Sequence, residues 1–164
     1  MREFFQQTII KNILRYALFG FLALLLQNML LTQTKIFGVY PMILPAAVVA
    51  VGMFEGPAFG ALFGLIIGIF ADMAFVENTI LFTVLFSAIG FFSAFMADFY
   101  INKRFVAFLV MALIAGLITA AFQMIKCMLS DEFSLSMLKT MLVQTAVSVP
   151  FSALAFPLPD GWNK

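Results

Sequence analysis

Long apolar segments recur along almost the whole chain, and they constrain the fold more than any other feature of the sequence. Of the 164 residues, 64% are hydrophobic and only 10% are charged, whereas about a quarter of the residues of a soluble domain are charged. So few polar side chains cannot coat a water-soluble globule. A bilayer core about 30 Å thick is crossed by an apolar helix of about 20 residues. The sequence therefore predicts an all-α integral membrane protein.

The apolar segments predict a single polytopic membrane domain over residues 1–164, with six transmembrane helices. The predicted spans are about 13–31, 39–54, 58–76, 80–99, 105–129 and 138–156. With a cytoplasmic N-terminus, six of the nine Lys and Arg residues fall on the inner side of the membrane and three on the outer side. Because Lys and Arg accumulate in cytoplasmic loops, this distribution predicts that both termini are cytoplasmic.

The residue inventory removes most catalytic and metal chemistry. The chain has no histidine and a single cysteine, Cys127, so it lacks His-based acid–base pairs, Cys/His zinc sites and an internal disulfide. Asp72 and Glu77 form only a loose candidate pair for acid–base catalysis. A net charge of +1 argues against nucleic acid as a partner. We expect a protein that is not an enzyme, with no cofactor, no metal site and membrane lipids around it.

A glycine ladder that begins in the turn "EGP" and continues through the third predicted span is the most distinctive local pattern. Gly56, Gly60, Gly64 and Gly68 are spaced four residues apart, and Asp72 follows at the same interval. Residues four apart share a helix face, and small residues let helices approach closely in lipid. The ladder predicts a packing groove, filled either by another helix of this chain or by a partner's transmembrane helix. A carboxylate in an apolar segment is costly and faces a protein interior or a cavity. Asp72 therefore predicts either helix-end anchoring or a hydrogen bond to a neighbouring helix, or else a polar contact that lines a cavity or a partner seam.

Other polar residues lie within the predicted spans. They include Gln27 and Asn28, then Thr119, Gln123 and Lys126, and finally Gln144, Thr145 and Ser148. One interpretation is interhelical hydrogen bonding, with the Lys126 ammonium extending toward the outer surface. The other is a ligand pocket near the outer leaflet built from Asp72, Gln123, Lys126 and Gln144.

The order of these motifs resembles the family of the rod shape-determining protein MreD. The first span ends in "LLLQNML", a proline-led second span reads "YPMILPAAVVAV", and "GPAFGALFGLIIGIFAD" follows. The resemblance implies a non-catalytic component of the cell-elongation machinery in a bacterial inner membrane, acting in rod shape and peptidoglycan synthesis. It implies an MreC-like bitopic partner, and through it MreB, RodA and the elongation penicillin-binding protein.

The alternative is a substrate-binding subunit of an energy-coupling-factor vitamin transporter, because that fold is similar to the MreD fold. Those subunits carry an Ala-xxx-Ala patch on the first helix. Here Ala17 is followed four residues later by Phe21, and the spaced pair Ala46 and Ala50 lies in the second span instead. The sequence therefore favours the elongation-machinery interpretation.

Overall fold

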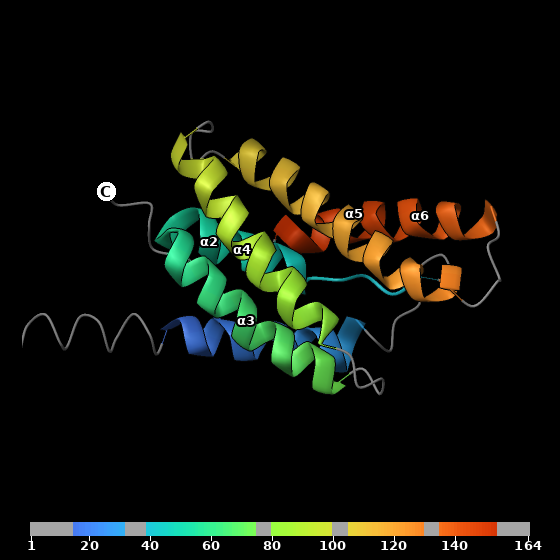
Figure 1. Ribbon diagram of the computed structural model, residues 1–164, viewed down its shortest axis with the longest axis horizontal. Coiled ribbons are helices and arrows are strands. Elements are labelled where there is room, and N and C mark those ends of the chain that lie inside the picture. Colours follow the sequence, from blue (N-terminus) through green and yellow to red (C-terminus); the bar gives the residue numbers. More distant parts are fainter. Residues whose placement is uncertain (1–14, 32–38, 75–79, 100–104, 130–134, 154–164) are drawn as a thin grey trace, which may run out of the picture.

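In the computed structural model of the protein, the described residues are 15–31, 39–74, 80–99, 105–129 and 135–153, and every regular element among them is a helix (Figure 1). The first helix is α-helical over residues 15–25 and continues as the π-helix η1 (Leu26–Leu31). It is followed by α2 (Leu44–Glu55), α3 (Pro57–Ala74), α4 (Leu81–Phe99), α5 (Phe105–Leu129) and α6 (Leu135–Ser152). The predicted all-helical fold class is confirmed.

The second predicted span departs most from its predicted bounds. Helix α2 begins at Leu44 rather than at residue 39, and the preceding residues 39–43 are not helical. The cause is Pro45, which lies in the first turn of α2, where a missing N–H costs nothing. A helix starting at residue 39 would put Pro45 in the helix interior, against the carbonyl of Pro41. The predicted ends of the third and sixth spans, at residues 76 and 156, lie outside the described residues.

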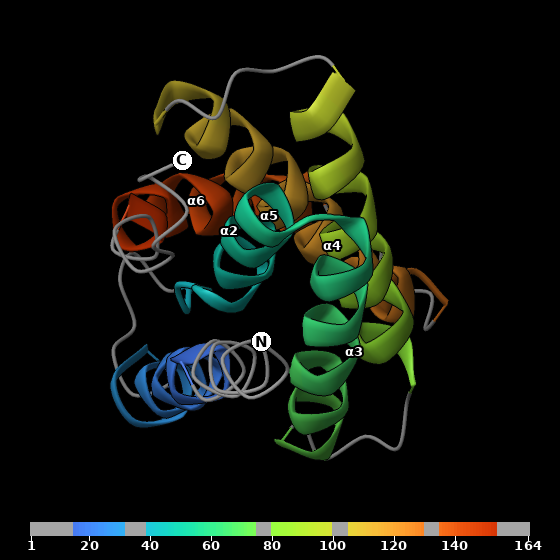
Figure 2. The same ribbon diagram turned by 90° about the vertical axis from the view of Figure 1, so that its left-hand side faces the viewer.

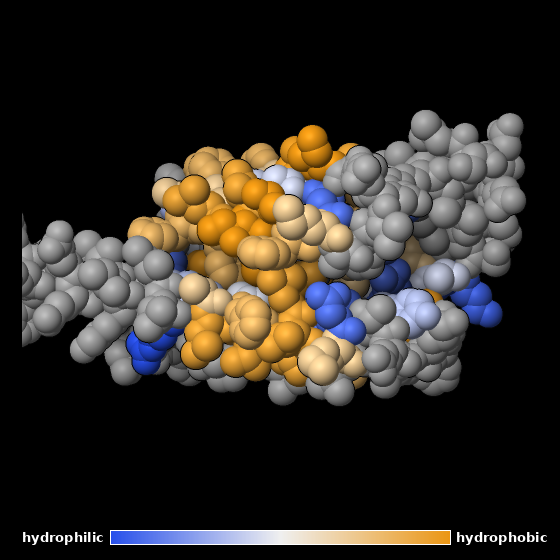
Figure 3. All heavy atoms as spheres, turned by 90° about the horizontal axis from the view of Figure 1, so that it is seen from below, coloured by the Kyte–Doolittle hydropathy of each residue, from blue (hydrophilic) through white to orange (hydrophobic). Residues whose placement is uncertain are grey.

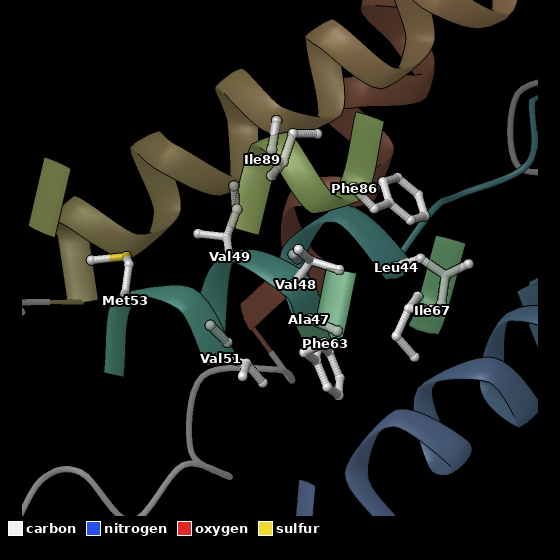
Figure 4. Packing of buried hydrophobic residues seen from close by; sticks show 14 of the residues in the cluster. Leu44, Ala47, Val48, Val49, Val51, Met53, Phe63, Ile67, Phe86 and Ile89 are labelled. Atoms are coloured by element: carbon white, nitrogen blue, oxygen red, sulfur yellow. The ribbon is translucent and has the colours of Figure 1, made fainter. Parts of the chain in front are cut away.

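Helix α2 forms the centre of the molecule. Every residue from Leu44 to Phe54 is buried, which matches a helix that is apolar on all sides. Helices α3, α4 and α5 pack around it. Figure 4 shows Val48 and Val49 of α2 beside side chains contributed by α3 and α4, such as Phe63 and Phe86. The small Ala, Val and Gly side chains of α2 allow three helices to approach it.

The first helix lies along one side of this core, next to α3 (Figure 2). The rings of Phe19 and Phe63 stack with their centroids 6.2 Å apart. A Cβ atom added at Gly20 would lie 3.0 Å from atoms of Phe63 and Ile67, so the backbone of the first helix approaches α3 closely. The hydroxyl of Tyr16 donates a hydrogen bond to the carboxylate of Glu55, at the end of α2. These contacts attach the first helix to both α2 and α3.

The outer surface is largely apolar, as the face shown in Figure 3 illustrates. Among the helices described, only α5 is both long and apolar enough to cross a membrane, over Phe105–Gln123 with a mean hydropathy of 2.6. Helices α2, α3 and α4 contain shorter apolar segments. Only 28% of the α5 segment is buried. The predicted six-span topology and the cytoplasmic termini stay predictions.

Candidate functional site

The glycine face of α3 lies directly against the backbone of α4. A Cβ atom added at Gly64 would lie 2.5 Å from the carbonyl carbon of Phe86, and one added at Gly68 would lie 2.7 Å from the carbonyl oxygen of Phe82. Real Cβ atoms essentially never come within 3.0 Å of another heavy atom of this kind. Any side chain at either position would therefore push the α4 backbone away.

Three glycines bring α2, α3 and α4 together at one point. A Cβ atom on Gly60 would lie 2.5 Å from the carbonyl oxygen of Gly90 and 2.7 Å from the Cα of Gly52. A Cβ atom on Gly52 would also lie 2.5 Å from the Gly90 oxygen. Each of the three helices contributes one glycine, so their backbones meet without intervening side chains. Gly52 and Gly90 are contact residues that the ladder did not reveal, because each stands outside it and the sequence does not show which helices meet.

The groove predicted from the ladder is thus filled by the chain's own helix. The contacts of Gly60, Gly64 and Gly68 descend along α4 from Gly90 to Phe82, so α3 and α4 pack antiparallel. Of the two occupants left open by the sequence, the structure places α4 of the same chain on this face. A partner helix cannot occupy the same face without displacing α4.

Gly56 has a different role from the other ladder glycines. A Cβ atom added there would meet nothing within 4 Å, so the residue is not a packing position. Its backbone has φ 99° and ψ 174° at the C-terminal cap of α2, a conformation that is open essentially to glycine alone. Its N–H donates to the carbonyl oxygen of Gly52 at 3.1 Å. Gly56 makes the turn that lets Pro57 begin α3.

Asp72 caps the N-terminus of α4. Its carboxylate accepts hydrogen bonds from the backbone N–H groups of Phe82 and Thr83, at 3.1 and 2.9 Å, and from the Thr83 hydroxyl at 2.6 Å. The first N–H groups of a helix have no partner within the helix, and the helix dipole favours a negative charge there. This cap, supplied by a neighbouring helix, accounts for a carboxylate in an apolar segment. It corresponds to the predicted hydrogen bond to a neighbouring helix.

Gln27 binds the non-helical segment that precedes α2. Its amide oxygen accepts from the Ile43 N–H at 2.9 Å, and its amide nitrogen donates to the Pro41 carbonyl at 3.1 Å. The side chain is only 3% exposed and lies in the π-helical turn η1. Buried backbone without regular secondary structure needs such partners. Gln27 therefore makes a buried hydrogen-bonded contact, but with a non-helical segment rather than with another helix as predicted.

Gln123 and Gln144, which the predicted pocket groups with Lys126, lie on α5 and α6 respectively. The Gln123 amide nitrogen lies 3.1 Å from the Met42 sulfur, a weak acceptor. Gln144, half-buried on α6, accepts the Ser148 hydroxyl through its backbone carbonyl at 2.7 Å. The side chain of Lys126 lies outside the described residues.

The predicted outer-leaflet pocket is not assembled by hydrogen bonds in the described residues. Asp72 pairs with α4, whereas Gln123 reaches Met42. A small cavity lies elsewhere, between the start of α2 and helices α5 and α6, with a volume of about 10 Å³. Its lining includes Met42, Ala46, Ala112, Gly116, Thr145 and Ser148. Sites for organic ligands usually have volumes of about 300–1,000 Å³, whereas about 10–15 Å³ holds one water molecule.

The outer side of the α3–α4 pair carries a shallow, open groove of about 450 Å³. Its lining includes Ala61, Leu65, Val84, Ser87, Ala88 and Phe91. This groove, called the hairpin groove below, lies on a different face from the glycine ladder and bears small side chains from both helices.

Among the residues described, no group of three or more His, Cys, Asp or Glu side chains lies close enough to hold a metal ion. Comparisons with protein-family models, with curated proteins and with solved structures find no match to this chain. The site features are therefore interpreted from their own geometry and from the sequence motifs.

Proposed function

We propose that the protein is a polytopic membrane protein with six spans and both termini in the cytoplasm. The observation that supports the membrane location is a surface rich in large, exposed apolar side chains, together with some polar side chains that are fully buried. Thr119 and Ser93 are at most 1% exposed, whereas Met73, Ile80 and Val106 are 77%, 74% and 69% exposed. Exposed apolar surface of this extent marks a membrane or protein contact.

Helix α5 supports the same proposal. Its apolar segment Phe105–Gln123 is only 28% buried, whereas an equally apolar helix of a soluble protein is a core element covered on all sides. Its buried polar residue Thr119 donates to the Ala115 carbonyl at 2.7 Å and so needs no water. In a bilayer, the exposed side of α5 would contact hydrocarbon.

The topology can be tested with single cysteines in cells, after Cys127 is replaced by serine. A membrane-impermeant thiol reagent should label Lys35→Cys from outside, because residue 35 lies in a predicted outer link. It should label Lys103→Cys only after the cells are opened. The reverse pattern, or labelling of both positions in intact cells, would contradict the proposed orientation.

We further propose, from the family resemblance, that this is a non-catalytic component of a bacterial cell-elongation complex in the inner membrane. An MreC-like bitopic protein is the proposed direct partner, with MreB, RodA and the elongation penicillin-binding protein linked through it. Support comes from the motif that carries the resemblance. Its residues Gly60, Gly64, Gly68 and Asp72 join α3 to α4 along one shared face, which gives a closely packed hairpin suited to a scaffold.

The partner's transmembrane helix would have to bind outside the glycine face, because α4 fills that face. The hairpin groove is the proposed contact. Its small residues Ala61, Ser87 and Ala88 are of the kind that permits close helix approach in lipid.

Co-purification with the MreC-like protein of the same organism tests this contact. Ala88→Leu would fill the hairpin groove and should reduce recovery of the partner about tenfold, equivalent to about 1.4 kcal/mol of binding free energy. The matched control is Ala146→Leu, at an exposed position of α6, which should leave recovery unchanged. Equal recovery with both variants would contradict the proposed contact. A vitamin retained through purification would instead favour the transporter-subunit alternative.

A further inference from the structure

Among the residues that the structure describes, the segment before α2 is the only buried stretch that is not helical. Pro41, Met42 and Ile43 are all buried, and their backbone groups are bound by side chains from distant helices. Gln27 of the first helix binds the backbone at Pro41 and Ile43 with two hydrogen bonds. The remaining donor, the Met42 N–H, bonds to the Ser148 hydroxyl of α6 at 2.9 Å.

These hydrogen bonds attach the segment unequally to its two neighbours, the first helix and α6. The segment is fixed to the first helix through both sides of the Gln27 amide, whereas α6 is joined to it by the Met42–Ser148 bond. The neighbouring hydroxyls of α6 do not add cross-links. Thr145 donates to the Met141 carbonyl and Ser152 to the Val149 carbonyl, both within α6.

Features of α6 and of its contact with α5 weaken the attachment of α6 to the segment before α2. Its main helix contact is α5, and Figure 1 shows α5 and α6 side by side at the edge of the molecule. Pro150 lies inside α6, where it removes one backbone hydrogen bond and favours a bend. Gly116 of α5 meets the Thr145 methyl group only at ordinary contact distance, 3.5 Å from an added Cβ. At Gly116, the seam between α5 and α6 thus lacks the backbone interlock seen between α3 and α4.

The cavity beside this bond lowers the free-energy cost of breaking it. Met42 and Ser148 both line the cavity of about 10 Å³, which is close to the volume of one water molecule. If the bond opened, a water molecule could accept from the Met42 N–H. The Ser148 hydroxyl would keep its bond to the Gln144 carbonyl. The buried donor would therefore not be left without a partner.

We propose that the hydrogen bond from the Met42 N–H to the Ser148 hydroxyl is a latch, and that the hydroxyl-lined seam between α6 and the α2 segment opens when this latch is released. In the closed state the seam has room for about one water molecule. In the open state α6 moves away while the segment stays attached through Gln27. The latch is a conformational element of the fold and does not depend on the proposed partner.

Thiol labelling of the full-length protein in detergent tests the latch. The reporter is Ala112→Cys, a buried position that lines the cavity, in a chain with Cys127 replaced by serine. Ser148→Ala should speed labelling about tenfold, because removing one side of a buried hydrogen bond shifts an equilibrium by about that factor. Ser148→Thr keeps a hydroxyl and should restore the slow rate.

The matched control is Ser152→Ala, which removes a hydroxyl that bonds only within α6 and should leave labelling within about twofold of the parent rate. Equal acceleration by Ser148→Ala and Ser152→Ala, or no acceleration by either, would overturn the proposal. Circular dichroism verifies that each variant keeps its helix content.

Hydrogen exchange of the unmodified protein provides a test that needs no variant. Ile43 N–H is held by Gln27 and Met42 N–H by the latch, at equal distances of 2.9 Å. Latch opening exposes only the Met42 donor, so Met42 should exchange at least about tenfold faster than Ile43. Equal protection of the two amides would overturn the proposal.

Discussion

The α3–α4 and α5–α6 pairs are both built on small residues, but the small residues meet different neighbours. On α3, an added Cβ at Gly64 would lie 2.5 Å from backbone atoms of α4, whereas on α5 an added Cβ at Gly116 would lie 3.5 Å from a Thr145 methyl group. The first pair is interlocked backbone against backbone and capped by Asp72. The second is separated by hydroxyl side chains and a cavity. Small residues at helical spacing therefore indicate close approach, but not how close.

The largest effect should come from Gly64→Leu. The added side chain has no space, because it would meet the α4 backbone rather than a movable side chain. We expect destabilisation of about 3 kcal/mol or more, the upper range for overpacking a core. Thermal unfolding in detergent, followed by circular dichroism, measures it. An unfolding temperature equal to that of the parent would show that α3 and α4 are not interlocked.

Gly56→Ala should have a smaller effect. At this ladder position the free-energy cost of a side chain comes from backbone conformation, whereas at Gly64 it comes from lack of space. A side chain at Gly56 meets no neighbour, but φ of 99° strains any residue with a Cβ by about 1–3 kcal/mol. We expect destabilisation of about 2 kcal/mol in the same unfolding assay. Stability unchanged by this substitution would mean that the turn between α2 and α3 adopts another conformation.

Asp72→Ala should destabilise the protein by about 1–2 kcal/mol, which is the range for losing a helix cap. Three groups at the start of α4 donate hydrogen bonds to Asp72: the N–H groups of Phe82 and Thr83 and the Thr83 hydroxyl. All three would lose their acceptor. Asp72→Asn keeps an acceptor oxygen and should lose about half as much. Faster amide exchange confined to the first turn of α4 would locate the effect, and an unchanged first turn would contradict the cap.

The smallest effect, with the opposite sign, is expected for Gly116→Ala. The added methyl would fit at 3.5 Å from Thr145, and alanine favours a helix over glycine by about 1 kcal/mol. We expect unchanged or slightly increased stability, by up to about 1 kcal/mol. A loss similar to that of Gly64→Leu would show that the two helix pairs pack in the same way.

Much of the fold follows from the sequence because long apolar segments of this kind form helices with simple boundaries. Helix α5 begins and ends at the predicted residues, Phe105 and Leu129. The predicted start of α2 is wrong because Pro45 marks the first turn of the helix rather than a position inside it. The π-helical turn at η1 also has no distinct sequence signal in "LQNMLL".

The candidate site was predicted in part. The polar residues Gln27 and Asp72 stand out against an apolar background, so a hydrogen-bonding role could be inferred for each of them. Their partners could not, since both bind backbone groups: Gln27 those of Pro41 and Ile43, and Asp72 those of Phe82 and Thr83. A backbone N–H or carbonyl carries no residue-specific signal.

By itself, the sequence determined that the described chain is helical, where its close-packing and polar residues lie, and which of them share a helix face. These properties depend on local spacing and on the solubility of side chains. The tertiary structure decided that α4 fills the glycine face and that Ser148 meets Met42. Such pairings depend on which surfaces fit at van der Waals distance, because glycine faces and backbone groups offer the same chemistry to every helix that can reach them.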